Sequence, residues 1–110
     1  MTLPEMVIAV LQELGAIHAE ETPTAADAAF VTTRYERWRS LSEKRFIIDW
    51  DSTDDIPAGA EDAVTLIVAY HCAPAYGIPK DRQSYEDGRT MLFEYRDNWK
   101  PNQPMKMVYF

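Results

Sequence analysis

The chain has 110 residues, of which 46% are hydrophobic and 26% charged, a composition typical of one globular domain with a modest core. Eighteen acidic residues against eleven basic ones give a formal net charge of -7, which argues against DNA binding through a broad basic face. No apolar run approaches the roughly 18 residues of a membrane span, and the N-terminus lacks the basic start of a secretory signal. The single cysteine excludes an internal disulfide. From the length and the absence of a membrane span we expect one domain with no membrane association.

The first two predicted helices carry clear start signals. Thr2 and Glu5 form a capping-box pattern, and a stripe of apolar residues follows and ends at Gly15. A second start appears at Thr24, with Asp27 three residues later, and predicts a helix over about residues 25–41. Its expected buried face contains seven residues, with the arginine-rich side facing solvent: Ala26, Ala29, Phe30, Thr33, Arg37, Trp38 and Leu41.

Residues 45–50 have the β-branched and aromatic content of a short strand, and the turn-rich acidic segment 51–55 follows. No partner strand lies nearby in the sequence. The segment either pairs with the C-terminal residues or is simply extended.

The most apolar stretch runs over residues 57–77 and predicts the central helix. Apolar residues cover most of its circumference, so other elements must cover it on several sides. Pro57 precedes it, Glu61 and Asp62 suit its first turn, and Gly77 suits a left-handed cap.

A fourth helix is predicted over about residues 80–99, where Tyr85, Gly88, Leu92 and Tyr95 follow a near-heptad spacing. Gly88 on this seam permits close approach to another helix. The fold class expected is therefore mainly α: a small four-helix bundle over residues 1–99 with one short extended or β segment. Residues 100–110 are expected to form an extended C-terminal docking tail, whose alternating apolar residues require a partner surface: Met105, Lys106, Met107, Val108, Tyr109 and Phe110.

Charge is segregated along the chain. Residues 1–33 contain five acids and no base, residues 34–45 contain five bases and two acids, and residues 49–62 contain six acids and no base. These segments are either solvated faces or patches that meet on neighbouring copies in an assembly. The second interpretation selects subunit contacts on both sides: Arg34, Arg37, Arg39, Asp54 and Asp55.

The sequence contains no motif that indicates catalysis or a cofactor. His71 and Cys72 are adjacent on a helix and point about 100° apart, so they do not readily chelate one ion. The segment from Asp49 begins like a calcium loop, but Asp54 stands where the turn glycine is required. No phosphate loop or nucleophile motif is present. We therefore expect no enzyme, no cofactor and no metal.

Several short motifs resemble the head-to-tail adaptor proteins of tailed phages, which include packaged-DNA stabilisation proteins. The first half of the pattern is Val10 to Gly15, then Thr24 with Asp27, then Trp38. The strongest similarity runs from Ile56-Pro57 through Leu66-Ile67-Val68-Ala69 to Ala73-Pro74-Ala75-Tyr76-Gly77, similar to the third helix of that family.

The resemblance implies a virion protein at the head–tail interface that is made in the host cytoplasm. It implies a ring, typically dodecameric, that binds the portal protein and a downstream tail or stopper protein and helps retain packaged DNA. Packaged DNA then passes through the channel without specific binding. The alternative is a small soluble helical binding or regulatory protein, for instance a dimer that buries its tail.

Overall fold

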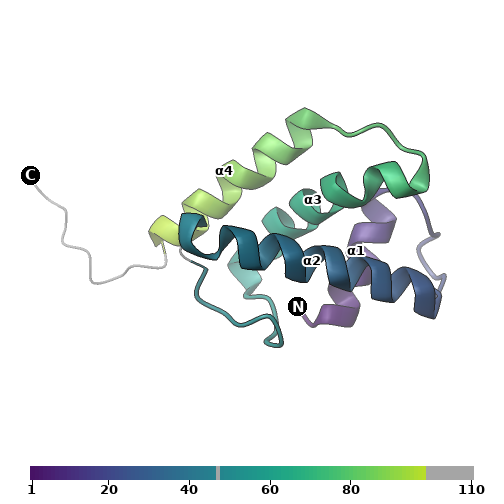
Figure 1. Cartoon of the computed structure of the whole chain (residues 1–110), viewed down its shortest axis with the longest axis horizontal. Helices are drawn as coiled ribbons and strands as arrows, with labels where there is room; N and C mark the ends of the chain where they lie inside the picture. The colour runs from purple at the N-terminus through teal and green to yellow at the C-terminus, as the bar shows by residue number, and fades with distance from the viewer. Residues whose placement is uncertain (47, 99–110) are drawn as a thin grey trace, which may run out of the picture.

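The computed structural model describes residues 1–46 and 48–98, and it is mainly helical (Figure 1). Four α-helices follow in chain order: α1 (Leu3–Glu13), α2 (Ala25–Phe46), α3 (Glu61–Cys72) and α4 (Arg82–Asn98). Short 3-10 helices flank α3, η1 (Ala58–Ala60) before it and η2 (Ala73–Tyr76) after it. The predicted mainly α fold with four helices is confirmed. Trp99 and the expected docking tail lie outside the described residues.

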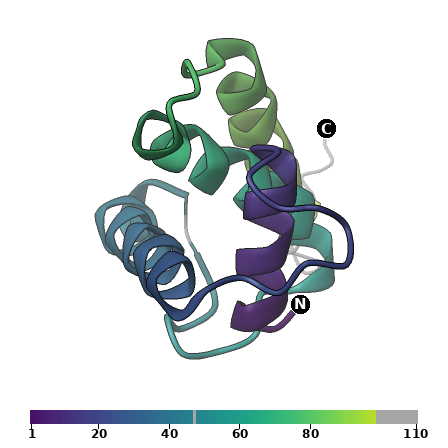
Figure 2. The same ribbon diagram turned by 90° about the vertical axis from the view of Figure 1, so that its right-hand side faces the viewer.

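Helix α3 is central, because it contacts each of the other three helices. Figure 2 shows α1, α2 and α4 arranged around it, and α2 and α4 touch each other only slightly. The buried face of α3 includes Val64, Ile67, Val68 and Cys72, as the apolar stretch predicts. Gly88 of α4 lies against it: a Cβ built there would stand 2.9 Å from Cγ1 of Ile67.

The predicted helix ends are formed by the expected groups. The backbone N–H of Glu5 donates to Oγ1 of Thr2 at 3.2 Å, and the N–H of Thr2 donates to the Glu5 carboxylate at 2.7 Å. The N–H of Asp27 donates to Oγ1 of Thr24 at 3.1 Å. Gly77 ends η2 with a φ of 71°, a left-handed conformation that glycine adopts without strain.

The start of the chain is tied to the start of α3. The ammonium group of Met1 donates to the carbonyl of Ile56 at 2.6 Å and lies 2.8 Å from the carboxylate of Glu61. The N–H of Ile56 donates in turn to the carbonyl of Met1 at 2.7 Å. Two segments more than fifty residues apart are thus joined by reciprocal hydrogen bonds.

Trp38 of α2 is buried as predicted, but most of the buried face expected for this helix is wrong: Ala26, Ala29, Thr33, Arg37 and Leu41 are exposed, Leu41 to 79%. Among the α2 residues whose side chains are described, the buried ones are Val31, Tyr35, Trp38, Arg39 and Ser42. The buried face was not recognised in the sequence because it contains the polar residues Arg39 and Ser42, which interrupt the pattern of apolar residues expected of a core-facing helix. The helix also continues to Phe46.

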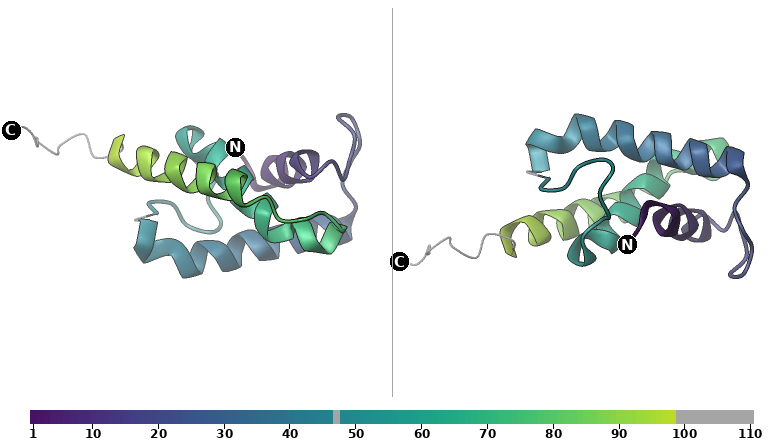
Figure 3. Two further views of the ribbon diagram at one scale, coloured as in Figure 1. Left: turned by 90° about the horizontal axis from the view of Figure 1, so that it is seen from above. Right: turned by 90° about the horizontal axis from the view of Figure 1, so that it is seen from below.

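The strand expected over residues 45–50 is not formed in the described part of this segment. Residues 45 and 46 are the last turn of α2, and residues 48–50 are irregular. A lone strand would leave its backbone groups unpaired. Here the chain instead turns back beside the ends of α2 and α4, as seen from above and below in Figure 3.

Candidate functional site

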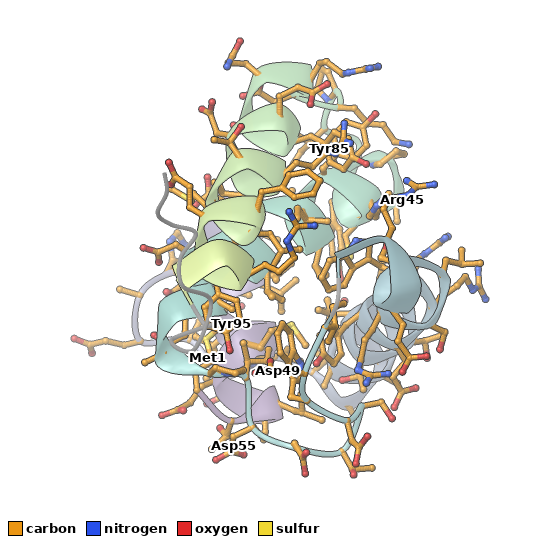
Figure 4. The ribbon with its side chains drawn as sticks, turned by 90° about the vertical axis from the view of Figure 1, so that its left-hand side faces the viewer. Met1, Arg45, Asp49, Asp55, Tyr85 and Tyr95 are labelled. Carbon is orange, nitrogen blue, oxygen red and sulfur yellow. The ribbon has the colours of Figure 1, made fainter. Side chains whose placement is uncertain are left out.

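An open groove of about 370 Å³ lies between α2 and α4, with α3 at its base. We call it the arginine groove. Figure 4 shows Arg45 of α2 and Tyr85 of α4 on its two sides. Most of its lining comes from α2, with one residue each from α3 and α4: Arg34, Arg37, Trp38, Leu41, Ser42, Arg45, His71 and Tyr85.

The spacing of α2 explains how one helix supplies this lining. Arg34, Trp38, Leu41 and Arg45 are separated by four, three and four residues, so they form one stripe along the helix. Positive charge therefore alternates with apolar surface along the groove. Leu41, at 79% exposure, is the most exposed large apolar side chain of the described residues.

Aromatic rings contact one arginine of the groove, Arg34, and a neighbouring arginine of α4, Arg89. The Arg34 guanidinium lies 5.2 Å from the centroid of the Phe30 ring, and that of Arg89 lies 5.8 Å from the centroid of Tyr85. Tyr85 stacks on Tyr70 with 4.4 Å between the ring centroids. Such contacts hold the rings and the guanidinium groups in place.

His71 contributes a neutral wall to the groove. Burial lowers the pKa of its imidazole, and the positive charges of Lys80 and Arg34 lower it further. Its ring lies edge-on to Tyr85 with 5.8 Å between centroids. The charge of the groove therefore comes from its three arginines, and none of its described lining residues is acidic.

This arrangement suits the binding of an anionic segment that also carries some apolar surface. Arginine and aromatic residues are enriched at the centres of protein interfaces, where planar guanidinium groups bind carboxylates through two hydrogen bonds. The groove concentrates positive charge on a protein whose net charge is -7. An acidic protein segment is thus a better match than nucleic acid, which the rest of the molecule repels.

The segment 49–55 forms a second charged surface, which we call the acidic loop. It carries four aspartates, Asp49, Asp51, Asp54 and Asp55, all exposed. Two hydrogen bonds between Asp51 and Asp54 form a turn within the loop. The N–H of Asp54 donates to the Asp51 carbonyl at 3.1 Å, and the N–H of Asp51 donates to the Asp54 carboxylate at 3.0 Å. The carboxylates thus project from an ordered turn.

Buried groups of α2 anchor this loop through Trp50. The Nε of Arg39 donates to the Trp50 carbonyl at 2.8 Å, and a terminal nitrogen of the same guanidinium donates to it as well. The indole N–H of Trp50 donates to the hydroxyl of Tyr35 at 2.7 Å. The backbone of the loop is consequently fixed from inside the core.

A second anchor comes from α4. The hydroxyl of Tyr95 donates to the Asp49 carboxylate at 3.1 Å, and its ring lies edge-on to Trp50. Burial, with the hydrogen bond to Asp49, raises the pKa of Tyr95 to about 12, so the hydroxyl keeps its proton. The loop is therefore held between α2 and α4.

The expected subunit contacts fall into three groups. Arg34 and Arg37 line the arginine groove, and Asp54 and Asp55 lie exposed on the acidic loop. Arg39 has a different role from the one expected: it is only 7% exposed and its guanidinium holds Trp50 inside the same chain. The side chain is buried because it satisfies a backbone carbonyl that water does not reach.

The expected tail contacts, Met105 to Phe110, lie outside the described residues. Sequence reasoning missed the groove residues Trp38, Leu41, His71 and Tyr85, which it assigned to packing or structural positions. The spacing of residues 34, 38, 41 and 45 was the available signal.

Comparisons with protein-family models, with curated proteins and with solved structures found no match. No helix in the described part of the chain is long and apolar enough to cross a membrane. Within residues 1–46 and 48–98, no three potential metal ligands come together. Cys72 is buried, and burial raises the pKa of its thiol to about 11.

Proposed function

We propose that this protein is a structural connector of a tailed-phage particle, a head-to-tail adaptor that forms a ring on the portal protein. In this role it joins the portal to a downstream tail or stopper protein and helps to retain packaged DNA, which passes through the channel without specific binding. Its place is the neck of the virion. The mechanism is docking.

The observation that carries this proposal is the presence of two separate, oppositely charged surfaces on one small subunit. The arginine groove and the acidic loop are different patches, so contacts between them are heterologous and generate rings or filaments. The resemblance of residues 56–77 to the third helix of phage adaptors directs the proposal to a ring in the virion neck. The apolar segment 105–110 supplies the expected contact with the portal.

The test is co-expression with a tailed-phage portal protein, followed by purification and electron microscopy. We expect the full chain to form a ring on the portal. Deletion of residues 105–110 is expected to abolish attachment while leaving the Tm nearly unchanged, because the buried faces of the four helices already supply a hydrophobic core. A matched control replaces Lys100 with Gln and keeps the apolar tail.

Two results would contradict the proposal. If the full chain forms a stable dimer alone and ignores the portal protein, it is a soluble binding module. If removal of residues 105–110 sharply lowers the Tm, the segment belongs to the domain's own core rather than to a docking contact. Mass photometry of the isolated chain separates monomer, dimer and ring in one measurement.

A further inference from the structure

We propose that the arginine groove of one copy receives the acidic loop of a second copy. The inference rests on the proposed function, since it specifies how subunits of the connector contact each other. It commits to a second copy of this chain as the occupant, because three arginines line the groove and three exposed aspartates, Asp51, Asp54 and Asp55, project from the loop.

The cations of the groove are available to a partner. Arg37 and Arg45 are exposed and Arg34 is half-buried, and none of them forms an ion pair among the described residues. The five ion pairs found there involve Met1, Arg39, Arg82 and Arg89 as the cationic groups. An incoming carboxylate therefore has no internal competitor in the described part of the chain.

The carboxylates of the loop are equally accessible. The side chain of Asp51 is 85% exposed and lies 4.0 Å from Arg39, at the limit of an ion pair. Asp55 is exposed and has no hydrogen bond among the described residues. Arg39 already holds the Trp50 carbonyl, and Tyr35 and Tyr95 hold the side chains of Trp50 and Asp49, so the start of the loop loses little conformational freedom on binding.

The loop cannot fill the groove of its own chain. The side chains of Tyr35 and Arg39 project from α2 toward the loop, where they bond to Trp50. The stripe through Trp38 and Arg45 lies on another side of α2 and faces α4. Figure 4 shows the separation: Arg45 and Tyr85 lie in its upper half, and Asp55 lies at the lower edge. The contact must therefore form between two copies, each of which offers one groove and one loop.

The experiment uses two neutralised variants of the full chain. The groove variant carries Arg37→Gln and Arg45→Gln, and the loop variant carries Asp54→Asn and Asp55→Asn. All four side chains are exposed, so both variants should unfold at nearly the wild-type temperature. A matched control carries Arg82→Gln and Glu20→Gln, two exposed residues that belong neither to the groove lining nor to the loop.

Association is measured by analytical ultracentrifugation at the highest soluble concentration, at low and at high salt. We expect the wild type and the control to associate at low salt and to dissociate as salt rises. Each neutralised variant alone should remain a monomer. An equimolar mixture should form dimers and nothing larger, because one intact loop can enter one intact groove and the remaining surfaces are both neutralised.

Three outcomes would overturn the inference: a wild type that remains monomeric, a neutralised variant that associates like the wild type, or a mixture without dimers. Portal attachment of the same variants is a separate measurement. If attachment survives while the pairing fails, the connector function stands with a different subunit contact. If the pairing holds and the portal is ignored, the connector proposal fails and the inference remains.

Discussion

Replacing Gly88 with Ala tests the packing of α4 on α3 with a single added methyl group. In an exposed helix this change stabilises by about 1 kcal/mol, because alanine has the higher helix propensity. Here the new Cβ would lie 2.9 Å from Cγ1 of Ile67, 3.1 Å from the carbonyl oxygen of Ala63 and 3.2 Å from Cβ of Leu66. A backbone oxygen and a fully buried side chain cannot move aside cheaply.

Overpacking of this kind costs about 1–3 kcal/mol, or more where backbone must shift. Because one of the clashing atoms is a backbone oxygen, we expect a cost in the upper part of this range, about 2–3 kcal/mol. After the propensity gain this leaves a net loss of about 1–2 kcal/mol, which lowers the Tm of a domain this size by roughly 5–15 °C. The assay is thermal and urea unfolding followed by circular dichroism. Thr90→Ala, on the exposed side of α4, is the control and should not lower the Tm.

A double-variant cycle locates the clash. Ile67→Ala removes one of the close contacts, so the loss caused by Gly88→Ala should be smaller in that background than in the wild type. A Gly88→Ala protein as stable as the wild type would refute the reasoning, because it would mean that the helices do not approach this closely.

Three further results are expected. Arg39→Gln should lower the free energy of unfolding, measured in urea, by about 1–3 kcal/mol, because the buried carbonyl of Trp50 loses a charged donor. An unchanged value would show that water replaces the guanidinium group as the donor. His71→Gln should flatten the pH dependence of stability on the acid side. The pKa of His71 is lowered from 6.5 in the folded state, so the unfolded chain takes up the proton first and wild-type stability falls as the pH drops below about 6.5; identical pH curves would contradict this. Cys72, whose pKa is about 11, should react with iodoacetamide at about pH 8 only after unfolding; rapid labelling of the native protein would place the thiol at the surface.

Helix positions followed from local signals in the sequence. Thr2 with Glu5 and Thr24 with Asp27 made the hydrogen bonds that their spacing predicts, and Gly77 adopted the left-handed cap. Gly88 on a near-heptad seam was also informative, since close approach demands the absence of a side chain. These features depend on residues a few positions apart, which a sequence displays directly.

The errors arose where a distant partner decides the structure. Arg39 looked like surface charge because its acceptor, the carbonyl of Trp50, comes eleven residues later and reaches it only when the chain turns back. The apolar run over residues 45–50 was predicted to be a strand from its composition alone. Whether such a run forms a strand depends on a partner strand elsewhere in the chain, which the local sequence does not show. Likewise the groove exists only because α3 brings His71, and α4 brings Tyr85, to the stripe on α2.

The hydrogen-bonded start of the chain has a practical consequence for reagent design. Residues fused ahead of Met1 convert its ammonium group to an amide, which removes the charge opposite Glu61 and crowds the carbonyl of Ile56. Ile56 follows Asp55 directly, so a purification tag at this end would disturb the exit of the acidic loop and imitate a docking defect. The connector between α1 and α2 lies at the opposite end of α2 from the acidic loop (Figure 1), and it contributes no residue to the arginine groove. Its residues Ala19 and Glu20 are exposed. A short epitope inserted there would report on the protein while leaving the groove and the loop untouched.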